Sequence, residues 1–290
     1  MKVIVTGGRG LIGSKFMKAY ANQYELVQLG ASHETRVDIT DSQALSSALN
    51  QHPDAQALIH LAAYTDVNGA FAQTDDKDGP AWKVNVVGTK NIADACAERG
   101  LYLIHVSTAY VFDGNKAAPY TELDAPKPIE WYGLTKYESE KAVQVSGAKA
   151  VILRIDQPFS REASPKVDTL WRIITGLRNG NLYPQFTNHY FGPTYIEDFI
   201  KVLDFCLRQQ ITGVYHASSG ESWSDFDFAS LVKTTLGLDG VIQKGDLGAY
   251  LRTLERPYQK NTAMDNSQLK AILDFPLLSI KEAVAQTKLF

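Results

Sequence analysis

Several features that would assign a protein to a special class are missing from this 290-residue sequence. No run approaches the roughly 20 consecutive apolar residues that a membrane span requires, so we expect no spanning helix. The apolar run in "MKVIVTGGRG" ends at glycine and is too short for the core of a signal peptide. The formal net charge of -3 argues against binding to nucleic acid.

Cysteine is scarce as well. Cys96 and Cys206 lie far apart in apolar surroundings with helical periodicity, which predicts two buried free thiols rather than a disulfide. Free thiols fit a reducing compartment, so we expect a cytoplasmic protein. The six histidines are scattered, with no pair at metal-ligand spacing, and we expect no metal site.

The sequence is instead rich in alternating strand and helix patterns. Apolar strands are predicted at residues 2–5, 25–30, 56–63, 101–108 and 148–155. Helices are predicted between them at residues 11–23, 41–52, 80–100 and 132–146. Strands that are apolar throughout and alternate with helices are typical of a parallel sheet covered on both faces. We therefore predict an α/β protein with a doubly wound, Rossmann-type sheet.

The pattern loosens after Arg154. Further helices are predicted at residues 169–180, 194–209, 224–237, 265–273 and 279–287, with one strand at 213–218. We expect the sheet domain to occupy residues 1–155 and a smaller mixed α/β domain to occupy 156–290. Segments around 185–216 are expected to return to the sheet.

Three glycines, Gly7, Gly10 and Gly13, follow the first predicted strand and lead into the first helix. Glycine is needed where a turn is tight and where the backbone approaches a pyrophosphate closely. The helix N-terminus then offers N–H groups to that anion. The context predicts a dinucleotide-binding domain over 1–155, with a purely structural turn as the alternative.

The end of the second strand bears on which dinucleotide is bound. An NAD site usually has an acid there for the ribose hydroxyls. Here residues 30–32 are "GAS", and Glu34 comes too late. Arg9 and Arg36 are suited to a 2'-phosphate, which favours NADP(H) over NAD(H). Asp38 is better placed for the adenine ring, unless it is only a turn or capping residue.

A tyrosine and a lysine stand four residues apart, so Tyr132 and Lys136 share one face of a predicted helix. A ketone reduced by hydride needs a proton on its developing alkoxide, and a free tyrosine with a pKa of ~10 can donate one. A neighbouring ammonium would lower that pKa toward the working range. The spacing predicts a proton-donating pair, although it also occurs by chance on helix surfaces.

These motifs together resemble a known superfamily. "TGGRGLIG", "HLAA", "NVVGTKN", "STAYVFDG" and "YGLTK" stand in the order and spacing of extended short-chain dehydrogenases/reductases. "AAYTDV", "FGPTYIEDF" and "RPYQKNTAMDNSQLK" are similar to the dTDP-4-dehydrorhamnose reductase branch. The resemblance runs from residue 1 to about 285.

The resemblance implies roles for individual residues. Thr108 would hydrogen-bond the substrate carbonyl, with Ser107 as a competitor for that role. Tyr132 would donate the proton, and Lys136 would tune it and hold the nicotinamide ribose. The implied cofactor site comprises Gly7, Arg9, Gly10, Leu11, Ile12, Gly13, Asp38, Ile39, Leu61, Ala62, Ala63, Tyr64, Asn85, Tyr132 and Lys136.

The implied substrate site is less sharply marked. It comprises Thr65, Val67, Thr108, Phe159 and Arg161. Thr65 and Val67 could instead belong to a plain loop. Arg161, Lys166, Arg172 and Arg178 would suit a pyrophosphate, or would each be solvated. Phe159 and Phe191 would pack a nucleotide base or simply the core.

The sequence also departs from the reductase pattern in two places. The loop at residues 68–79 is longer and more acidic than expected. "IDQPFS" stands after Arg154 where a tryptophan-containing string is expected. Both departures leave the shape of the sugar pocket open.

We therefore expect NAD(P)H-dependent reduction of a nucleotide-linked 4-keto sugar. Alternatives are an NAD-dependent sugar-nucleotide epimerase or dehydratase, and a non-catalytic NADP-binding regulatory subunit. A homodimer is expected through helices 80–99 and 132–146. Trp82, Val86 and Val143 would lie near that contact, unless they are buried within one chain.

Overall fold

The computed structural model describes residues 1–30 and 37–289. Arg36, Glu34 and Ser32 therefore lie outside the described residues. The chain divides into two compact units. Unit 1 comprises Met1–Val111, Glu130–Leu153 and Leu203–Val214. Unit 2 comprises Phe112–Ile129, Arg154–Val202 and Tyr215–Phe290.

Each unit is made of three separate segments of the chain, whereas one main boundary was predicted near residue 155. One boundary does fall between Leu153 and Arg154. However, Phe112–Ile129 belongs to unit 2 although it lies in the predicted first domain. Leu203–Val214 belongs to unit 1 and lies within the range 185–216 that was expected to return to the sheet. Loops leave little periodic signal in a sequence, so the exchange of Phe112–Ile129 was not predictable.

A six-stranded sheet has the order β10-β5-β4-β3-β1-β2. Its strands are β1 (Lys2–Thr6), β2 (Glu25–Leu29), β3 (Ala55–His60), β4 (Tyr102–Thr108), β5 (Ala150–Ile155) and β10 (Gly213–His216). The pairs β1–β2, β1–β3 and β3–β4 are parallel. The predicted Rossmann-type α/β fold is thereby confirmed.

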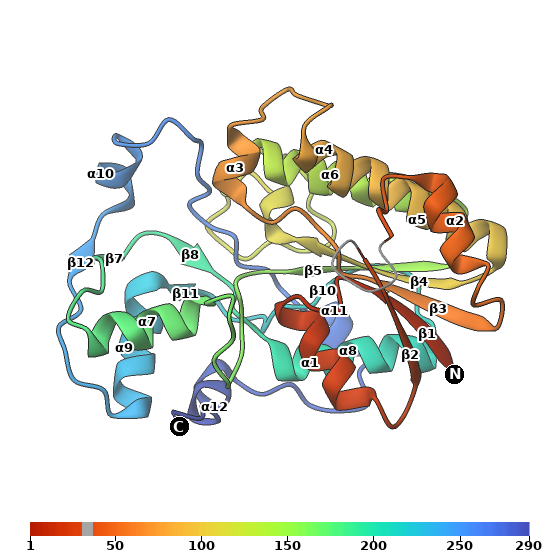
Figure 1. The fold of residues 1–290 in the computed structure, drawn as a ribbon. Coiled ribbons are helices and arrows are strands. Elements are labelled where there is room, and N and C mark those ends of the chain that lie inside the picture. The colour runs from red at the N-terminus through yellow and green to blue at the C-terminus, as the bar shows by residue number, and fades with distance from the viewer. Residues whose placement is uncertain (31–36, 290) are drawn as a thin grey trace. The chain divides into compact units, whose positions relative to one another are not determined.

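Helices cover both faces of the sheet in unit 1. They are α1 (Leu11–Tyr20), α2 (Ser42–Leu49), α3 (Val67–Phe71), α4 (Pro80–Trp82), the π-helical turn Lys83–Gly88, α5 (Thr89–Arg99) and α6 (Trp131–Val145). Figure 1 shows α2, α5 and α6 over one face and α1 over the other. Leu58, Leu103 and Ile92 are fully buried in the core between sheet and helices.

Unit 2 is built from helices and short paired strands. Its helices are α7 (Thr169–Arg178), the first part of α8 (Ile196–Gln209), α9 (Asp225–Leu236), α10 (Leu247–Leu251), α11 (Ser267–Lys270) and α12 (Ile280–Ala285). The strand pairs are β6 (Pro158–Phe159) with β9 (Thr194–Tyr195), β7 (Gln185–Phe186) with β12 (Lys244–Gly245), and β8 (Tyr190–Phe191) with β11 (Trp223–Ser224). Its core contains Phe159, Phe191 and Phe228, each at most 1% exposed.

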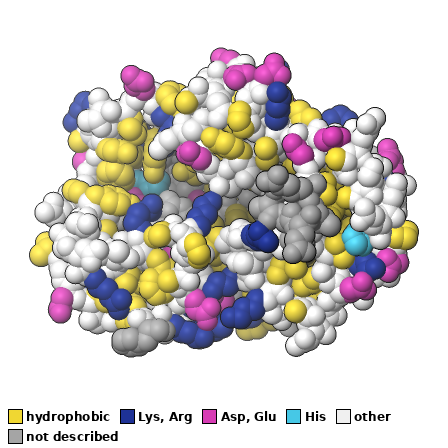
Figure 2. Space-filling model, in the orientation of Figure 1, with side chains coloured by type: hydrophobic (Ala, Val, Ile, Leu, Met, Phe, Trp, Pro, Cys, Tyr) yellow, Lys and Arg dark blue, Asp and Glu magenta, His cyan; other side chains and the backbone are white. Residues whose placement is uncertain are grey.

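Three further expectations concern the thiols, the membrane and the surface charge. Cys96 and Cys206 are free and buried, as predicted. Within residues 1–30 and 37–289, no helix is long and apolar enough to cross a membrane. On the face drawn in Figure 2, acidic and basic side chains of the described residues are interspersed.

A buried acid follows β5 in unit 2. Asp156 is 2% exposed, and its Oδ2 accepts hydrogen bonds from the amide of Gly192 (2.9 Å) and the hydroxyl of Thr262 (2.7 Å). Its Oδ1 is buried without a partner among the described residues. Burial raises the pKa of Asp156 from 3.8 to about 7, because desolvation disfavours the carboxylate.

This raised pKa makes stability depend on pH. Between about pH 4 and about pH 7 the unfolded chain loses the Asp156 proton while the folded chain keeps it, so stability falls as pH rises through that window. Asp156→Asn removes the titration and keeps the shape. We expect its stability relative to the unmodified chain to increase with pH, by about 1.4 kcal/mol per pH unit within the window.

Urea unfolding at about pH 4 and about pH 8 would measure the difference. Asp113→Asn is the matched control in the same unit, because hydrogen bonds, chiefly from Tyr120, lower the pKa of Asp113. The stability of Asp113→Asn relative to the unmodified chain should not increase with rising pH. A pH-independent difference between Asp156→Asn and the unmodified chain would contradict the prediction.

Candidate active site

The glycine loop connects β1 to α1 and packs closely against the segment after β3. Gly7 has a φ of +70°, and a Cβ there would lie 2.6 Å from the amide nitrogen of Ala62. A Cβ on Gly13 would lie 2.7 Å from the Cα of Gly8. Gly10 is the N-cap of α1 and offers no side-chain acceptor to the first amides of the helix. A backbone cradle with uncapped amides fits the pyrophosphate of a dinucleotide.

The other predicted cofactor residues differ in their surroundings. Leu11 and Ile12 lie half-buried in the first turn of α1, Arg9 is exposed, and Leu61, Ala62, Ala63 and Tyr64 follow β3 half-buried. Ile39 is 6% exposed in the core of unit 1.

Asp38 makes the contacts of a turn residue. Its Oδ1 accepts from the amide (2.9 Å) and hydroxyl (2.8 Å) of Thr40. The turn alternative therefore accounts for one carboxylate oxygen of Asp38. Asp41 is the residue that caps α2, by accepting from the amides of Gln43 and Ala44.

A buried row of polar side chains lies beneath this loop. Thr6 of β1, His60 of β3 and His105 of β4 are register partners across the sheet. His60 Nδ1 lies 2.7 Å from the Thr6 hydroxyl, and its Nε2 lies 3.0 Å from the hydroxyl of Thr89 in α5. The amide of Ala62 also donates to Thr6 Oγ1, at 3.3 Å. The row therefore ties the segments after β1 and β3 to each other and to α5.

Both imidazoles in this row are neutral near pH 7. Burial lowers the pKa of His60 to about 3 and that of His105 well below 6.5, and the charge of Lys136 adds to both effects. Because Thr6 Oγ1 already accepts from Ala62, we assign the Thr6 proton to His60 Nδ1 and the ring N–H to Nε2, which donates to Thr89. This row was not predicted from the sequence, although Thr6, His60 and His105 stand at or near the ends of apolar strands.

Asn85 links the loop after β3 to α6. Its Oδ1 accepts from the amide of Tyr64 (2.8 Å), and its Nδ2 donates to the carbonyl of Tyr64 (3.1 Å) and the hydroxyl of Thr135 (2.9 Å). It lies in the π-helical turn Lys83–Gly88, a kind of irregularity that is frequent at functional sites. Its polar groups are used within the protein, so it positions Tyr64 and the helix segment before Lys136.

The structure brings Thr108, Tyr132 and Lys136 together in unit 1. Thr108 ends β4 and is 8% exposed, and its hydroxyl hydrogen-bonds the phenol of Tyr132. Lys136 is 3% exposed, and its Nζ donates to the carbonyl of Val106 at 2.9 Å. The neighbouring Ser107 Oγ is buried without a partner among residues 1–30 and 37–289. Thr108 is thus the hydroxyl that meets the tyrosine.

The start of α6 fixes the tyrosine. Glu130 is the N-cap, and its carboxylate accepts from the amides of Tyr132 (2.8 Å) and Gly133 (2.6 Å). Gly133 packs against the carbonyl of Tyr110, where any Cβ would clash. Glycine after the tyrosine therefore lets α6 approach the end of β4 closely enough for Tyr132 to reach Thr108.

The pKa of Tyr132 is shifted in the direction opposite to the one expected. The sequence argument predicted a lowering by Lys136. Burial of the phenol instead raises the pKa above its usual value, the charge of Glu130 raises it further, and the hydrogen bond from Thr108 lowers it. Burial also lowers the pKa of Lys136 to about 8, against the effect of Glu140. The tyrosine is therefore held as an acid at neutral pH.

The segment after β3 carries the remaining candidates of unit 1. Thr65 is exposed, and Val67 is the first residue of α3, whose cap is Asp66. In the acidic loop, Gln73 donates to the Tyr64 hydroxyl (3.1 Å) and accepts from the amide of Ala81 (2.9 Å). The loop is therefore folded back onto the segment that carries Tyr64.

In unit 2 the structure favours the alternatives for most predicted residues. Phe159 is fully buried and Phe191 is 1% exposed, so both rings pack in the core instead of offering a face to a nucleotide base. The backbone and side chain of Arg161 meet Glu197. Lys166, Arg172 and Arg178 are exposed.

A cluster of aromatic side chains in unit 2 was missed. Phe186 packs on Tyr250 (ring centroids 5.2 Å apart), His189 packs on Tyr258 (5.3 Å), and the guanidinium of Arg256 lies 5.0 Å from the centroid of the Tyr258 ring. Its members are separated by up to 72 residues of sequence, from Phe186 to Tyr258, so no local motif marks them. Such faces can stack on a planar ligand, and the guanidinium can meet an anion.

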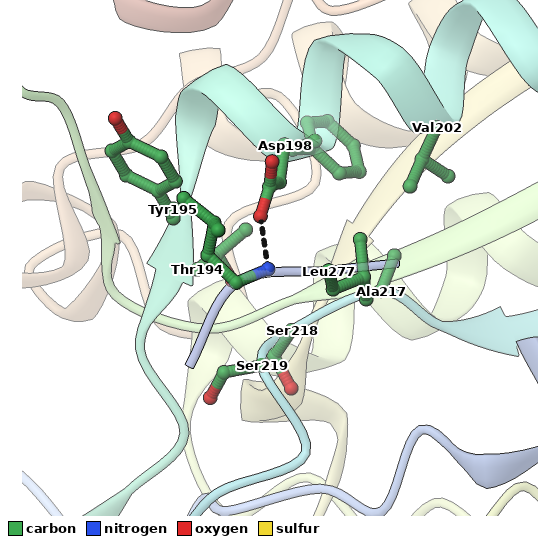
Figure 3. Close-up of a pocket in the computed structure, with 10 residues that line it drawn as sticks. Thr194, Tyr195, Asp198, Val202, Ala217, Ser218, Ser219 and Leu277 are labelled. Atoms are coloured by element: carbon green, nitrogen blue, oxygen red, sulfur yellow. Dashed lines mark hydrogen bonds between the residues drawn. The ribbon is translucent and has the colours of Figure 1, made fainter. Parts of the chain in front are cut away.

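A small cavity elsewhere in unit 2 is not a substrate pocket. Figure 3 shows Thr194, Asp198, Ala217 and Ser218 around it, and Asp198 Oδ2 accepts from the amide of Leu278 at 2.7 Å. Its volume of about 20 Å³ is enough for one water molecule, whereas ligand pockets occupy roughly 300–1,000 Å³. Ser218 Oγ has no hydrogen-bond partner within the described part of the chain and would suit such a water.

Comparison with known proteins shows the family of this chain. The family model described as "RmlD substrate binding domain" matches residues 1–288. A dTDP-4-dehydrorhamnose reductase of Mycobacterium tuberculosis is 30% identical over 245 residues, covering 82% of this chain and 76% of that protein. Methionine adenosyltransferase 2 subunit beta of Rattus norvegicus is 26% identical over 283 residues, covering 93% and 82%.

A solved structure shares the fold. The crystal structure of dTDP-4-dehydrorhamnose reductase from Bacillus anthracis in complex with NADP superposes with a TM-score of 0.88 at 23% identity, covering 98% of this chain and 96% of that one. With the family model matched over nearly the whole length, the chain belongs to the RmlD substrate binding domain family, within the extended short-chain dehydrogenases/reductases.

Proposed function

We propose that this chain reduces the 4-keto group of a nucleotide-linked sugar with a nicotinamide cofactor, NADPH in preference to NADH. The observation that carries the proposal is the meeting of Thr108, Tyr132 and Lys136 at the end of β4, in the same unit as a glycine cradle that fits a dinucleotide. Family membership supports the substrate class, since relatives are named dTDP-4-dehydrorhamnose reductase.

The chain's own residues account for the proton transfer. Bound nicotinamide supplies the hydride to the carbonyl carbon. Tyr132 releases its proton to the carbonyl oxygen, and Thr108 orients that oxygen and then donates to the phenolate left behind. Lys136, charged below about pH 8, stabilises the same phenolate. The phenolate of Tyr132 is protonated again from solvent after each turnover.

A second candidate function is a non-catalytic regulatory subunit. One observation favours it: a relative over 93% of this chain is named methionine adenosyltransferase 2 subunit beta. The intact Thr108, Tyr132 and Lys136 favour the enzyme, because a binding module has no need of all three. An epimerase would instead retain oxidised cofactor through purification, which the extracted ligand would reveal.

The catalytic assignment predicts different effects for three substitutions. Tyr132→Phe keeps the ring and removes the proton, so turnover of a dTDP-linked 4-keto-6-deoxy sugar should fall by ~10² to 10⁴ with little change in cofactor affinity. Lys136→Ala should lose rate and also weaken cofactor binding. Thr108→Val should lose rate with the smallest effect on the cofactor.

Turnover, cofactor affinity and melting temperature measured on the same three variants separate catalysis from structure. Lys141→Ala is a matched control on the same helix, since Lys141 is half-exposed and paired with Glu138. Unimpaired reduction by Tyr132→Phe would remove the phenol from the mechanism. No NADPH oxidation by the unmodified chain with any nucleotide-linked keto sugar would favour the regulatory subunit.

The cofactor preference is testable separately. The expected acid is missing after β2, and Arg9 and Arg36 are the candidate partners of a 2'-phosphate. NADPH should bind more tightly than NADH, and Arg9→Ala or Arg36→Ala should narrow the difference. Calorimetric titration of both cofactors measures this, and equal affinities in the unmodified chain would refute the preference.

We further propose a cytoplasmic homodimer. The expected contact is formed by the helices at residues 80–99 and 132–146, in which Val87 and Val145 are exposed by 36% and 83%. Val143, one of the residues expected there, is 2% exposed within the chain and packs in its core, so it is not part of the proposed contact. Sedimentation at micromolar concentration should give twice 32.0 kDa, and a single 32.0 kDa species would contradict the proposal.

A further inference from the structure

The N-cap of α6 is a glutamate, which is an unusual choice. Serine, threonine, aspartate and asparagine are the common N-caps because their short side chains reach the first free amides. Elsewhere in the described chain, Asp41, Asp66, Asp168 and Asp246 cap α2, α3, α7 and α10, and Ser224 and Ser279 cap α9 and α12. Capping alone therefore does not explain Glu130.

The carboxylate of Glu130 is held tightly and out of water. The residue is 6% exposed, and its two oxygens each accept one backbone amide, from Tyr132 at 2.8 Å and from Gly133 at 2.6 Å. A Cβ on Gly133 would lie 2.8 Å from the Oε1 of Glu130. Two amide donors and the positive end of the helix favour the charged carboxylate. A fixed negative charge thus lies beside the first turn that carries Tyr132.

We propose that Glu130 is a positioning residue for proton delivery: its buried carboxylate orients the first turn of α6 and opposes a second negative charge on Tyr132, so that the phenol keeps its proton until the substrate takes it. This inference rests on the proposed reduction. It makes the protonation state of the phenol depend on the helix cap as well as on the tyrosine itself.

Other groups around Tyr132 act in both directions. Thr108 of β4 favours the phenolate by a hydrogen bond, and Lys136 of α6 donates to the carbonyl of Val106. Tyr110 of the turn Ala109–Val111 contacts the ring edge-on, with centroids 5.7 Å apart, and Tyr64 packs in the same small cluster. Asp66, the cap of α3, is the acid on a second helix that packs against α6.

The balance of these influences favours the acid form. Burial and the charge of Glu130 raise the pKa of Tyr132, and the Thr108 hydrogen bond lowers it by less. In the reaction, the O–H bond of Tyr132 breaks and a new O–H bond forms on the sugar, while NADPH is oxidised to NADP⁺. The proton is thus given only to an oxygen that becomes more basic than the phenolate, which is the alkoxide formed by hydride addition.

The test replaces the charge and keeps the cap. Glu130→Gln retains one carbonyl acceptor at the same place, and Glu130→Ser supplies a neutral cap of the common kind. In the full, cofactor-free chain, tyrosines labelled at the hydroxyl-bearing ring carbon are titrated by NMR, and Tyr132→Phe identifies the Tyr132 signal. Asp41→Asn is the matched control, because it makes the equivalent charge-to-amide change at the cap of α2 in the same unit.

We expect the Tyr132 signal of Glu130→Gln to begin to titrate at a pH about 1 lower than in the unmodified chain, and Asp41→Asn to leave it in place. Oxidation of the hydroxy sugar by NADP⁺ needs the phenolate of Tyr132, so the rise of its rate with pH should begin at a pH about 1 lower in Glu130→Gln than in the unmodified chain. The same titration course in all three chains, with only the melting temperature changed, would reduce Glu130 to a structural cap and overturn the inference.

The two proposals fail in distinguishable ways. If the unmodified chain reduces no keto sugar but the Tyr132 signal still moves in Glu130→Gln, the proposed function fails and the effect of Glu130 on the phenol stands. If reduction occurs and the signal does not move, the proposed function stands and the inference fails. Glu130→Ser removes the charge without introducing the amide group of glutamine. If the loss of charge is the cause, it should move the Tyr132 signal in the same direction as Glu130→Gln.

Discussion

The buried imidazole of His60 joins the elements that a cofactor site requires. Its ring contacts Thr6 at the end of β1 and Thr89 in α5, and Thr6 in turn accepts from Ala62 after β3. Burial keeps the ring neutral, so each nitrogen has one fixed role, as acceptor or as donor. The glycine loop packs against Ala62 and is therefore tied to this buried hydrogen-bond chain.

Buried groups also control the protonation state of the proton donor, Tyr132. Burial and Glu130 favour the protonated form of Tyr132, and the hydrogen bond with Thr108 favours its loss of the proton. Glu130 and Thr108 are each at most 8% exposed, so water screens their interactions weakly. Opposed influences of this kind let one phenol be an acid in one step and be stabilised as a phenolate in the next.

The parts of the site that depend on local rules were predictable from the sequence. The glycine loop was predictable because tight turns and close backbone contacts need glycine, as at Gly7, Gly10 and Gly13. The alignment of Tyr132 and Lys136 was predictable because residues four apart lie on one face of a helix. What depends on tertiary burial was not: the predicted direction of the Tyr132 pKa shift was wrong because desolvation of the phenol and the charge of Glu130 raise that pKa. For the same reason, the sequence alone could not decide whether Phe159 contacts a ligand or packs in the core.

The exchange of segments between the two units has a consequence for synthesis on the ribosome. Unit 1 includes Leu203–Val214, which brings the edge strand β10 and the carbonyl of Ile211 that accepts from the Tyr102 hydroxyl at 2.6 Å. The first 153 residues therefore leave the ribosome as an unfinished sheet with β5 at its open edge. At roughly 5–20 residues per second, that edge stays unpaired for several seconds, a period in which a chaperone or a second nascent chain could occupy it.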